Sequence, residues 1–169
     1  GLWEPVLAQA KPGDFLIIQF SHNDQKTDVE RATDPATTFR QNLVRYIREF
    51  RAKGGHPILA TPVCRRKFDD QGLLVDTHGR YPNAIRAVAQ EESVPLLDLQ
   101  TSTAQWLIRA GPETSKAYFM WLERGRYRQF PEGNKDDTHF VEAGAEAVGR
   151  LAAAELRAHG HPLAKWLKE

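Results

Sequence analysis

Short apolar runs alternate with segments of helical periodicity, and this alternation is the feature that most limits how the chain can fold. The apolar runs cover residues 15–20, 57–63 and 94–99. The amphipathic segments cover residues 37–51, 81–92, 102–110 and 141–159. Strands that alternate with helices in this way form parallel sheets with helical crossovers. The sequence therefore predicts an α/β fold in which helices cover both faces of a parallel sheet.

The composition of the chain disfavours several broad classes of protein. The 169 residues contain no repeat and no low-complexity linker, so we expect a single domain over residues 1–169. The 23 Lys and Arg residues balance 22 Asp and Glu residues, which gives no sign of a nucleic-acid partner. No apolar run approaches the roughly 20 residues that span a bilayer. One cysteine, Cys64, excludes an internal disulfide.

Two short polar motifs follow or precede these elements. Residues 20–26 read Phe-Ser-His-Asn-Asp-Gln-Lys after the first apolar run, and residues 136–140 read Asp-Asp-Thr-His-Phe before the last helix. An Asp-x-x-His pair can orient an imidazole as the base for a serine nucleophile, so Asp136 and His139 are candidate catalytic residues. The amide of Asn23 is a candidate oxyanion donor. Working residues of such sheets gather beyond the carboxyl ends of the strands, so we expect all three on one rim.

Each of these features also has a simpler interpretation. Asp136 could cap the last helix and leave His139 merely exposed, and Asn23 could simply close a turn. A metal held by His22, Asp24, Asp136 and His139 is a weaker alternative, because the set is dispersed and mixed. The pair Arg65-Arg66 is most often solvated, although guanidinium groups on a rim would suit an acidic sugar. Trp121 is the one tryptophan whose loop-rich surroundings would suit a sugar platform.

Taken together, the motifs resemble those of the SGNH (GDSL-type) hydrolases, most closely the rhamnogalacturonan acetylesterase branch. The residues that carry the resemblance are Lys11-Pro12-Gly13-Asp14, Asn23-Asp24-Gln25-Lys26, Asn42-Leu43, Thr61-Pro62-Val63 with Arg65-Arg66, Thr77-His78-Gly79 with Tyr81, and Asp136-Asp137-Thr138-His139-Phe140. The resemblance implies a flavodoxin-like sheet of order 2-1-3-4-5. It also implies a secreted or periplasmic serine esterase that needs no cofactor and no metal.

The resemblance assigns roles to individual positions. Asn23 matches the oxyanion-hole asparagine, and Asp136 and His139 match the acid and base of the triad. Five further residues match recurring rim positions of the family: Gln25, Lys26, Arg65, Arg66 and Tyr81. Of these, Arg65, Arg66 and Tyr81 are expected to bind substrate.

The chain also departs from the family pattern. The Gly-Asp-Ser block with the nucleophile and a second glycine block are both missing, and none of the chain's four serines lies in a nucleophile motif. Together with a start that lacks Met, this predicts an N-terminally truncated member that is inactive by itself. Ser21 stands where the family has glycine, so we expect it to point away from the imidazole rather than replace the nucleophile.

These observations predict an esterase that deacetylates pectin or rhamnogalacturonan-like polysaccharide. The alternatives are a non-catalytic remnant or fragment with residual carbohydrate binding, and a GDSL-type lipase or thioesterase. No nucleic-acid or membrane partner is expected.

In the family the strand at residues 15–20 lies beside the nucleophile-bearing strand. Its free edge should therefore be covered by a second copy in a homodimer or by a complementing N-terminal segment.

Overall fold

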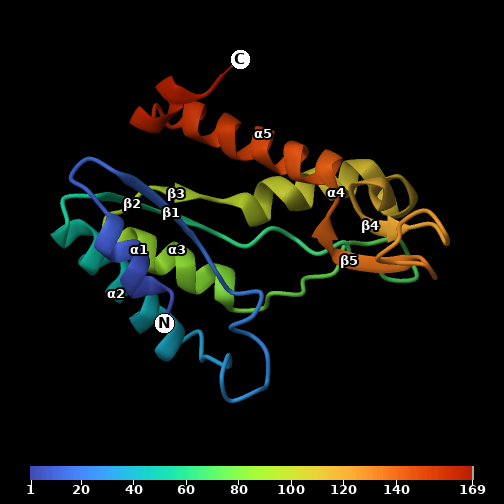
Figure 1. The fold of residues 1–169 in the computed structure, drawn as a ribbon, viewed down its shortest axis with the longest axis horizontal. Coiled ribbons are helices and arrows are strands. Elements are labelled where there is room, and N and C mark those ends of the chain that lie inside the picture. Colours follow the sequence, from blue (N-terminus) through green and yellow to red (C-terminus); the bar gives the residue numbers. More distant parts are fainter. Residues whose placement is uncertain (169) are drawn as a thin grey trace. The chain divides into compact units, whose positions relative to one another are not determined.

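A computed structural model describes residues 1–168, which form two compact units that interleave along the sequence (Figure 1). The first unit contains Gly1–Pro62 and His78–Asp98, and the second contains Val63–Thr77 and the chain from Leu99 onward. The chain passes from one unit to the other after Pro62, Thr77 and Asp98, so neither unit is a consecutive half of the sequence. That the chain forms a single domain stays a prediction.

The first unit is built on three parallel strands, β1 (Phe15–Gln19), β2 (His56–Ala60) and β3 (Leu96–Leu97). Their order in the sheet is β1-β2-β3, as Figure 1 shows. All three were predicted, although each is shorter than its apolar run, and β2 begins one residue before the run at 57–63. Pro62 and Pro95 have no N–H to donate to a ladder, and both lie outside the strands.

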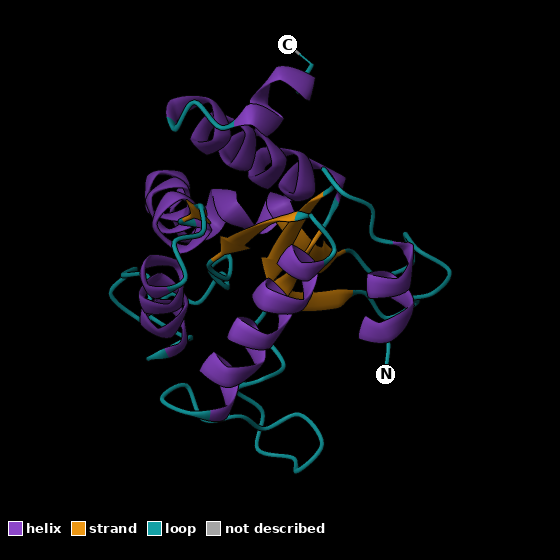
Figure 2. Cartoon of the chain, turned by 90° about the vertical axis from the view of Figure 1, so that its left-hand side faces the viewer, coloured by secondary structure: helices purple, strands orange, loops and turns teal. Residues whose placement is uncertain are grey.

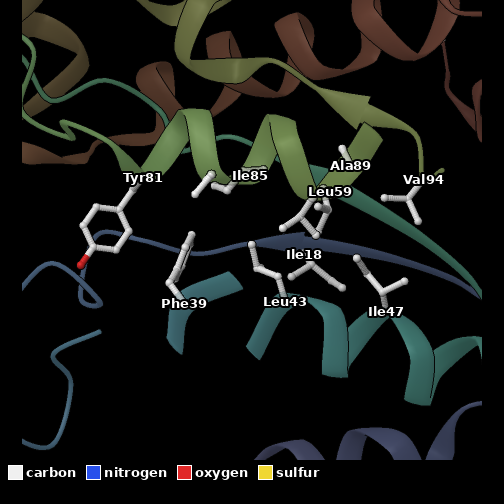
Figure 3. Close-up of a cluster of buried hydrophobic side chains, with 11 residues drawn as sticks. Ile18, Phe39, Leu43, Ile47, Leu59, Tyr81, Ile85, Ala89 and Val94 are labelled. Atoms are coloured by element: carbon white, nitrogen blue, oxygen red, sulfur yellow. The ribbon is translucent and has the colours of Figure 1, made fainter. Parts of the chain in front are cut away.

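Helices α1 (Trp3–Gln9), α2 (Thr38–Ala52) and α3 (Tyr81–Glu91) complete the first unit. Helices α2 and α3 contact each other and β2, and Figure 3 shows their apolar side chains converging with those of the strands. The buried residues of this core are Ile18, Phe39, Leu43, Ile47, Leu59, Tyr81, Ala84, Ile85, Val88, Ala89 and Val94. The helical periodicity found in residues 37–51 and 81–92 therefore marks the faces that are buried.

The second unit contains helices α4 (Leu99–Thr114) and α5 (Glu142–Ala158), the short 3-10 helices η1 (Ser115–Tyr118) and η2 (Pro162–Trp166), and the strands β4 (Phe119–Leu122) and β5 (Asn134–Phe140). Figure 2 distinguishes these helices and strands by colour. Gly111 (φ 73°, ψ 171°) interrupts α4, which agrees with the predicted helix end at residue 110. An aromatic cluster lies within this unit, where the rings of Phe119 and Phe140 are 4.7 Å apart.

Strands β4 and β5 form an antiparallel hairpin that the sequence analysis did not predict (Figure 1). Residues 136–139 were expected in a loop, but they lie within β5. Their polar sequence lacks the apolar alternation by which strands are recognised, which explains the error. The strand is also irregular, because Trp121 pairs with Lys135 and Phe119 pairs with Phe140. Between these paired positions β4 advances by two residues and β5 by five, so β5 bulges at residues 136–139.

The α/β fold class is confirmed, with a parallel sheet flanked by helices. Within residues 1–168, none of the helices combines the length and the apolar character required to cross a membrane.

Candidate functional site

The bulge of β5 brings Asp136 and His139 together. Nδ1 of His139 lies 2.6 Å from Oδ2 of Asp136. The other carboxylate oxygen of Asp136 accepts hydrogen bonds from the backbone N–H groups of Thr138 and His139, at 2.7 and 3.0 Å. The turn is therefore closed by the same carboxylate that binds the imidazole.

The electrostatics of this pair favour an ionised Asp136. Partial burial alone would raise the pKa of Asp136, but the hydrogen bonds from His139 and Thr138 outweigh it and lower the pKa below its usual value. An ionised carboxylate accepts only, so the bonded Nδ1 of His139 carries the proton. Nε2 of the neutral ring is then left without a proton, as a general base requires. The His139 side chain is 72% exposed, whereas that of Asp136 is 25% exposed.

Asp137 is bound from two sides in the same unit. The backbone N–H of Arg66 donates to the Asp137 carbonyl at 2.8 Å, and its guanidinium Nη1 lies 3.3 Å from Asp137 Oδ1. The indole Nε1–H of Trp121 donates to the same carboxylate oxygen at 2.8 Å. The Arg66 guanidinium also lies over the Trp121 ring, 4.7 Å from its centroid. Sequence reasoning missed Asp137, although its position beside Asp136 was a usable signal.

Arg65 has a different environment from its neighbour Arg66. Its Nη1 donates to the carbonyl and hydroxyl oxygens of Thr77, at 3.2 and 3.3 Å. Partial burial lowers the pKa of the Arg65 guanidinium, because it weakens the hydration of the charged form. Arg65 is partly exposed, whereas Arg66 is only 6% exposed.

In the first unit, Asn23 lies in the turn that follows β1. Its side chain is exposed, and its carbonyl accepts the backbone N–H of Lys26 at 2.9 Å. The neighbouring Asp24 binds this turn together, because its Oδ2 accepts the backbone N–H of Ser21 at 2.9 Å.

Tyr81 holds the same loop from α3. Its hydroxyl lies 3.0 Å from the Asp24 carbonyl oxygen and 2.6 Å from that of Thr33. Tyr81 is buried, and its ring packs edge-on against Phe39. The contacts of Tyr81 and Arg66 are thus internal, which favours a positioning role over the expected substrate contact. Among the three tentative substrate-binding residues, Arg65 is the one that is partly exposed.

Ser21 has the backbone conformation of a glycine. Its φ is +117°, a value at which the backbone of any residue with a side chain is strained. The residue is also fully buried. Its Oγ has no hydrogen-bond partner among the described residues. A fully buried hydroxyl is inaccessible to a polymer, which supports the expectation that Ser21 is not a substitute nucleophile.

A histidine pair lies close to this turn. The rings of His22 and His78 are 4.6 Å apart and nearly perpendicular. Nδ1 of the buried His78 lies 3.0 Å from Nε2 of Gln25, so one of the expected rim residues binds inward. Within residues 1–168 no three His, Cys, Asp or Glu side chains are grouped as a metal site would require.

The structure thus brings together Asp136 and His139 in one unit and places Asn23 in the other. The predicted meeting of all three on one rim stays a prediction. Within the second unit, both serine hydroxyls have partners other than the imidazole: that of Ser102 contacts Glu155, and that of Ser115 contacts the Pro112 carbonyl.

Comparison with known proteins gives consistent matches. A family model described as the GDSL-like lipase/acylhydrolase family matches residues 1–147. The rhamnogalacturonan acetylesterase RhgT of Bacillus subtilis is 40% identical over 163 residues, which cover 96% of this chain and 69% of RhgT. The probable rhamnogalacturonan acetylesterase YesY of the same organism is 35% identical, with coverage of 96% and 71%.

Among solved structures, that of the Bacillus subtilis protein YxiM is similar, with a TM-score of 0.75 and 31% identity. The match covers 96% of this chain but only 42% of the YxiM chain. The likeness therefore extends over nearly all of these residues and less than half of that protein.

Proposed function

The chain belongs to the GDSL-like lipase/acylhydrolase family, and we propose that its residues form part of a serine esterase that removes acetyl groups from pectin or rhamnogalacturonan-like polysaccharide. The observation that carries the proposal is the 2.6 Å hydrogen bond between Asp136 and His139, which leaves the second imidazole nitrogen available as a base. The substrate class follows from RhgT and YesY, whose names give this activity.

In the proposed reaction, Nε2 of His139 takes the proton of a serine hydroxyl as its oxygen attacks the acetyl carbonyl. Asp136 holds the ring and stabilises the imidazolium that forms. The exposed amide of Asn23 donates to the carbonyl oxygen as it becomes negative. His139 then returns the proton to the sugar oxygen that leaves, and the acetyl group remains on the serine until water removes it. Arg65 is proposed to bind the acidic sugar as a charged donor.

We also propose that these 169 residues alone do not catalyse this reaction. Ser21 is buried, and the hydroxyls of Ser102 and Ser115 are engaged elsewhere. A chain without a nucleophile retains its base and acid but cannot form the acyl intermediate. The coding sequence upstream of Gly1 can be read for a Gly-Asp-Ser segment. This tests whether the natural protein has the nucleophile that these 169 residues lack.

The test of function uses two polypeptides. In the natural polypeptide that contains these residues, His139→Ala should lower acetate release from acetylated rhamnogalacturonan by at least about 10³-fold, the scale of losing a triad member. The exposed Asp70→Asn serves as a control and should keep wild-type activity. The 169-residue chain should neither hydrolyse an aryl acetate nor react with a serine-directed phosphonate. Full activity of the His139→Ala variant would exclude the proposal.

The two alternatives give different results in the same experiment. A remnant with residual carbohydrate binding would retain oligosaccharides but release no acetate in either polypeptide. A lipase or thioesterase of the family would prefer long-chain esters to acetylated pectin.

The edge of β1 supports a further part of the proposal. Among the described residues β1 pairs only with β2, and it contains no charge of the kind that usually protects an edge. Ile17 and Phe20 are 44% and 46% exposed, and with α1 they line a groove of about 570 Å³. We propose that another strand covers this edge, supplied by an antiparallel copy of the chain or by a complementing N-terminal segment. A monodisperse monomer in light scattering, with rapid amide exchange along β1, would argue against both.

By analogy with its family, we further propose that the protein works outside the cytoplasm, as a secreted or periplasmic enzyme. Fractionation of the native organism, with immunodetection of the chain, tests this assignment.

A further inference from the structure

The Asp136–His139 pair lies where regular sheet pairing is interrupted. Between the paired positions at Lys135 and Phe140, the bulge leaves the residues of β5 without the usual succession of partners on β4. A bulged segment has lost part of its ladder, so other contacts must define its geometry. The internal bonds of Asp136 close the turn, but they do not attach it to the rest of the unit.

Arg66 provides that attachment at Asp137, the central part of the bulge. One bond joins the two backbones, from the Arg66 N–H to the Asp137 carbonyl at 2.8 Å. A second contact joins the side chains, with guanidinium Nη1 3.3 Å from carboxylate Oδ1. Together these two contacts hold Asp137 through both its backbone and its side chain.

The burial of the Arg66 guanidinium costs free energy, which the contacts around it must offset. The residue is 6% exposed, and its Nε has no hydrogen-bond partner among the described residues. A buried guanidinium with an unmatched donor is unfavourable unless its remaining contacts are well placed. Here the group lies over the Trp121 ring, and Trp121 donates to the same oxygen of Asp137. The side chains of Arg66, Trp121 and Asp137 therefore form one network, and Asp137 is the residue that follows Asp136 of the Asp136–His139 pair.

We propose that Arg66 is a positioning residue, which acts through Asp137 to hold the Asp136 carboxylate on Nδ1 of His139. The catalytic use of that geometry rests on the proposed function, but the geometry itself does not. Replacement of the Arg66 side chain keeps the backbone bond to the Asp137 carbonyl, but it leaves the Asp137 carboxylate with only its bond from Trp121. The bulge is then held less firmly, and Asp136 can rotate away from the ring. His139 would then lose the acceptor that keeps its proton on Nδ1.

The experiment measures the tautomer of His139 in the 169-residue chain by ¹⁵N NMR, with the signals assigned through His139→Gln. The wild-type ring should carry its proton on Nδ1. In Arg66→Met the ratio of the Nδ1–H form to the Nε2–H form should fall at least about tenfold, which corresponds to a loss of about 1.4 kcal/mol. Lys67→Met is the matched control, because it removes a neighbouring exposed cation of the same loop. It should leave the ratio unchanged.

A second variant separates positioning from folding. If Arg66→Met does not fold, Asp137→Asn removes the charge that faces Arg66 while it preserves the shape and an acceptor for Trp121. The same fall in the tautomer ratio is expected. A folded variant of either kind with the wild-type ratio would overturn the proposal.

Kinetics of the natural polypeptide distinguish this role from substrate binding. Loss of a positioning residue should lower kcat and leave KM nearly unchanged, whereas loss of a substrate contact should raise KM. An increase in KM alone would therefore contradict positioning. If the wild-type polypeptide releases no acetate, the proposed function fails, but the tautomer measurement still decides the role of Arg66.

Discussion

His139 and Asp136 are joined by a 2.6 Å hydrogen bond across a turn that the Asp136 carboxylate itself closes. One carboxylate therefore has two tasks, because it accepts the imidazole N–H with one oxygen and two backbone N–H groups with the other. Loss of its charge should weaken both the turn and the orientation of the ring.

The stability of the fold should depend on pH through Asp136. Its pKa is lower in the folded protein than in the unfolded chain, so its ionised form stabilises the fold above the ordinary value of about 3.9. This contribution is lost as the pH falls through the folded-state pKa. The difference in Tm between wild type and Asp136→Asn should therefore be largest near neutral pH and shrink below about pH 4. Asp70→Asn should show no such pH-dependent difference. A constant difference at all pH values would contradict the assignment.

Ser21→Gly should stabilise the protein. The substitution removes a side chain from a strained φ of +117° and a buried hydroxyl without a partner, each worth about 1–3 kcal/mol. The greater freedom of glycine in the unfolded chain offsets about 0.5–1 kcal/mol of this. Chemical denaturation should show a net gain of at least about 1 kcal/mol. Ser93→Gly is the comparison, because Ser93 also has positive φ but is exposed, and its gain should be smaller.

Tyr81→Phe should loosen the loop that carries Asn23. The variant keeps the ring against Phe39 but removes the hydroxyl that lies against the carbonyl oxygens of Asp24 and Thr33. A loss of about 1–2 kcal/mol is expected, with faster amide exchange in residues 22–33. Tyr46→Phe removes a hydroxyl that makes no such bond to any of residues 1–168 and should leave this exchange unchanged. Equal exchange in both variants would show that Tyr81 does not hold the loop.

Two glycines of α5 should respond in opposite ways to alanine. A Cβ at Gly144 would lie 2.1 Å from the Tyr118 carbonyl oxygen, so Gly144→Ala must displace the start of the helix after β5. We expect a loss of at least about 1–3 kcal/mol. A Cβ at Gly149 meets nothing within 4 Å, so Gly149→Ala should gain about 0.5–1 kcal/mol through helix propensity. Denaturation of both variants by urea provides the measurement, and a destabilised Gly149→Ala would contradict the reasoning.

Much of the local structure follows from the sequence, because burial imposes a periodicity on it. The strands at Phe15–Gln19 and His56–Ala60 were predicted from continuous apolar runs, and helix α2 from Phe39, Leu43 and Ile47 at helical spacing. The motif of Asp136 and His139 was visible as well, since the two partners are three positions apart, a spacing that a tight turn brings together. Family membership, too, followed from the order of the motifs along the chain.

The hairpin and the network around Asp137 could not be predicted in this way. Strand β5 is polar, and its place depends on partners distant in sequence, namely Trp121 on β4 and Arg66 in the segment between the strands of the first unit. The sequence shows Arg66 as one of two adjacent arginines. Only tertiary structure decides that one is buried against Trp121 and the other partly exposed. Burial of a charge requires a partner that covers it, and no local pattern specifies that partner.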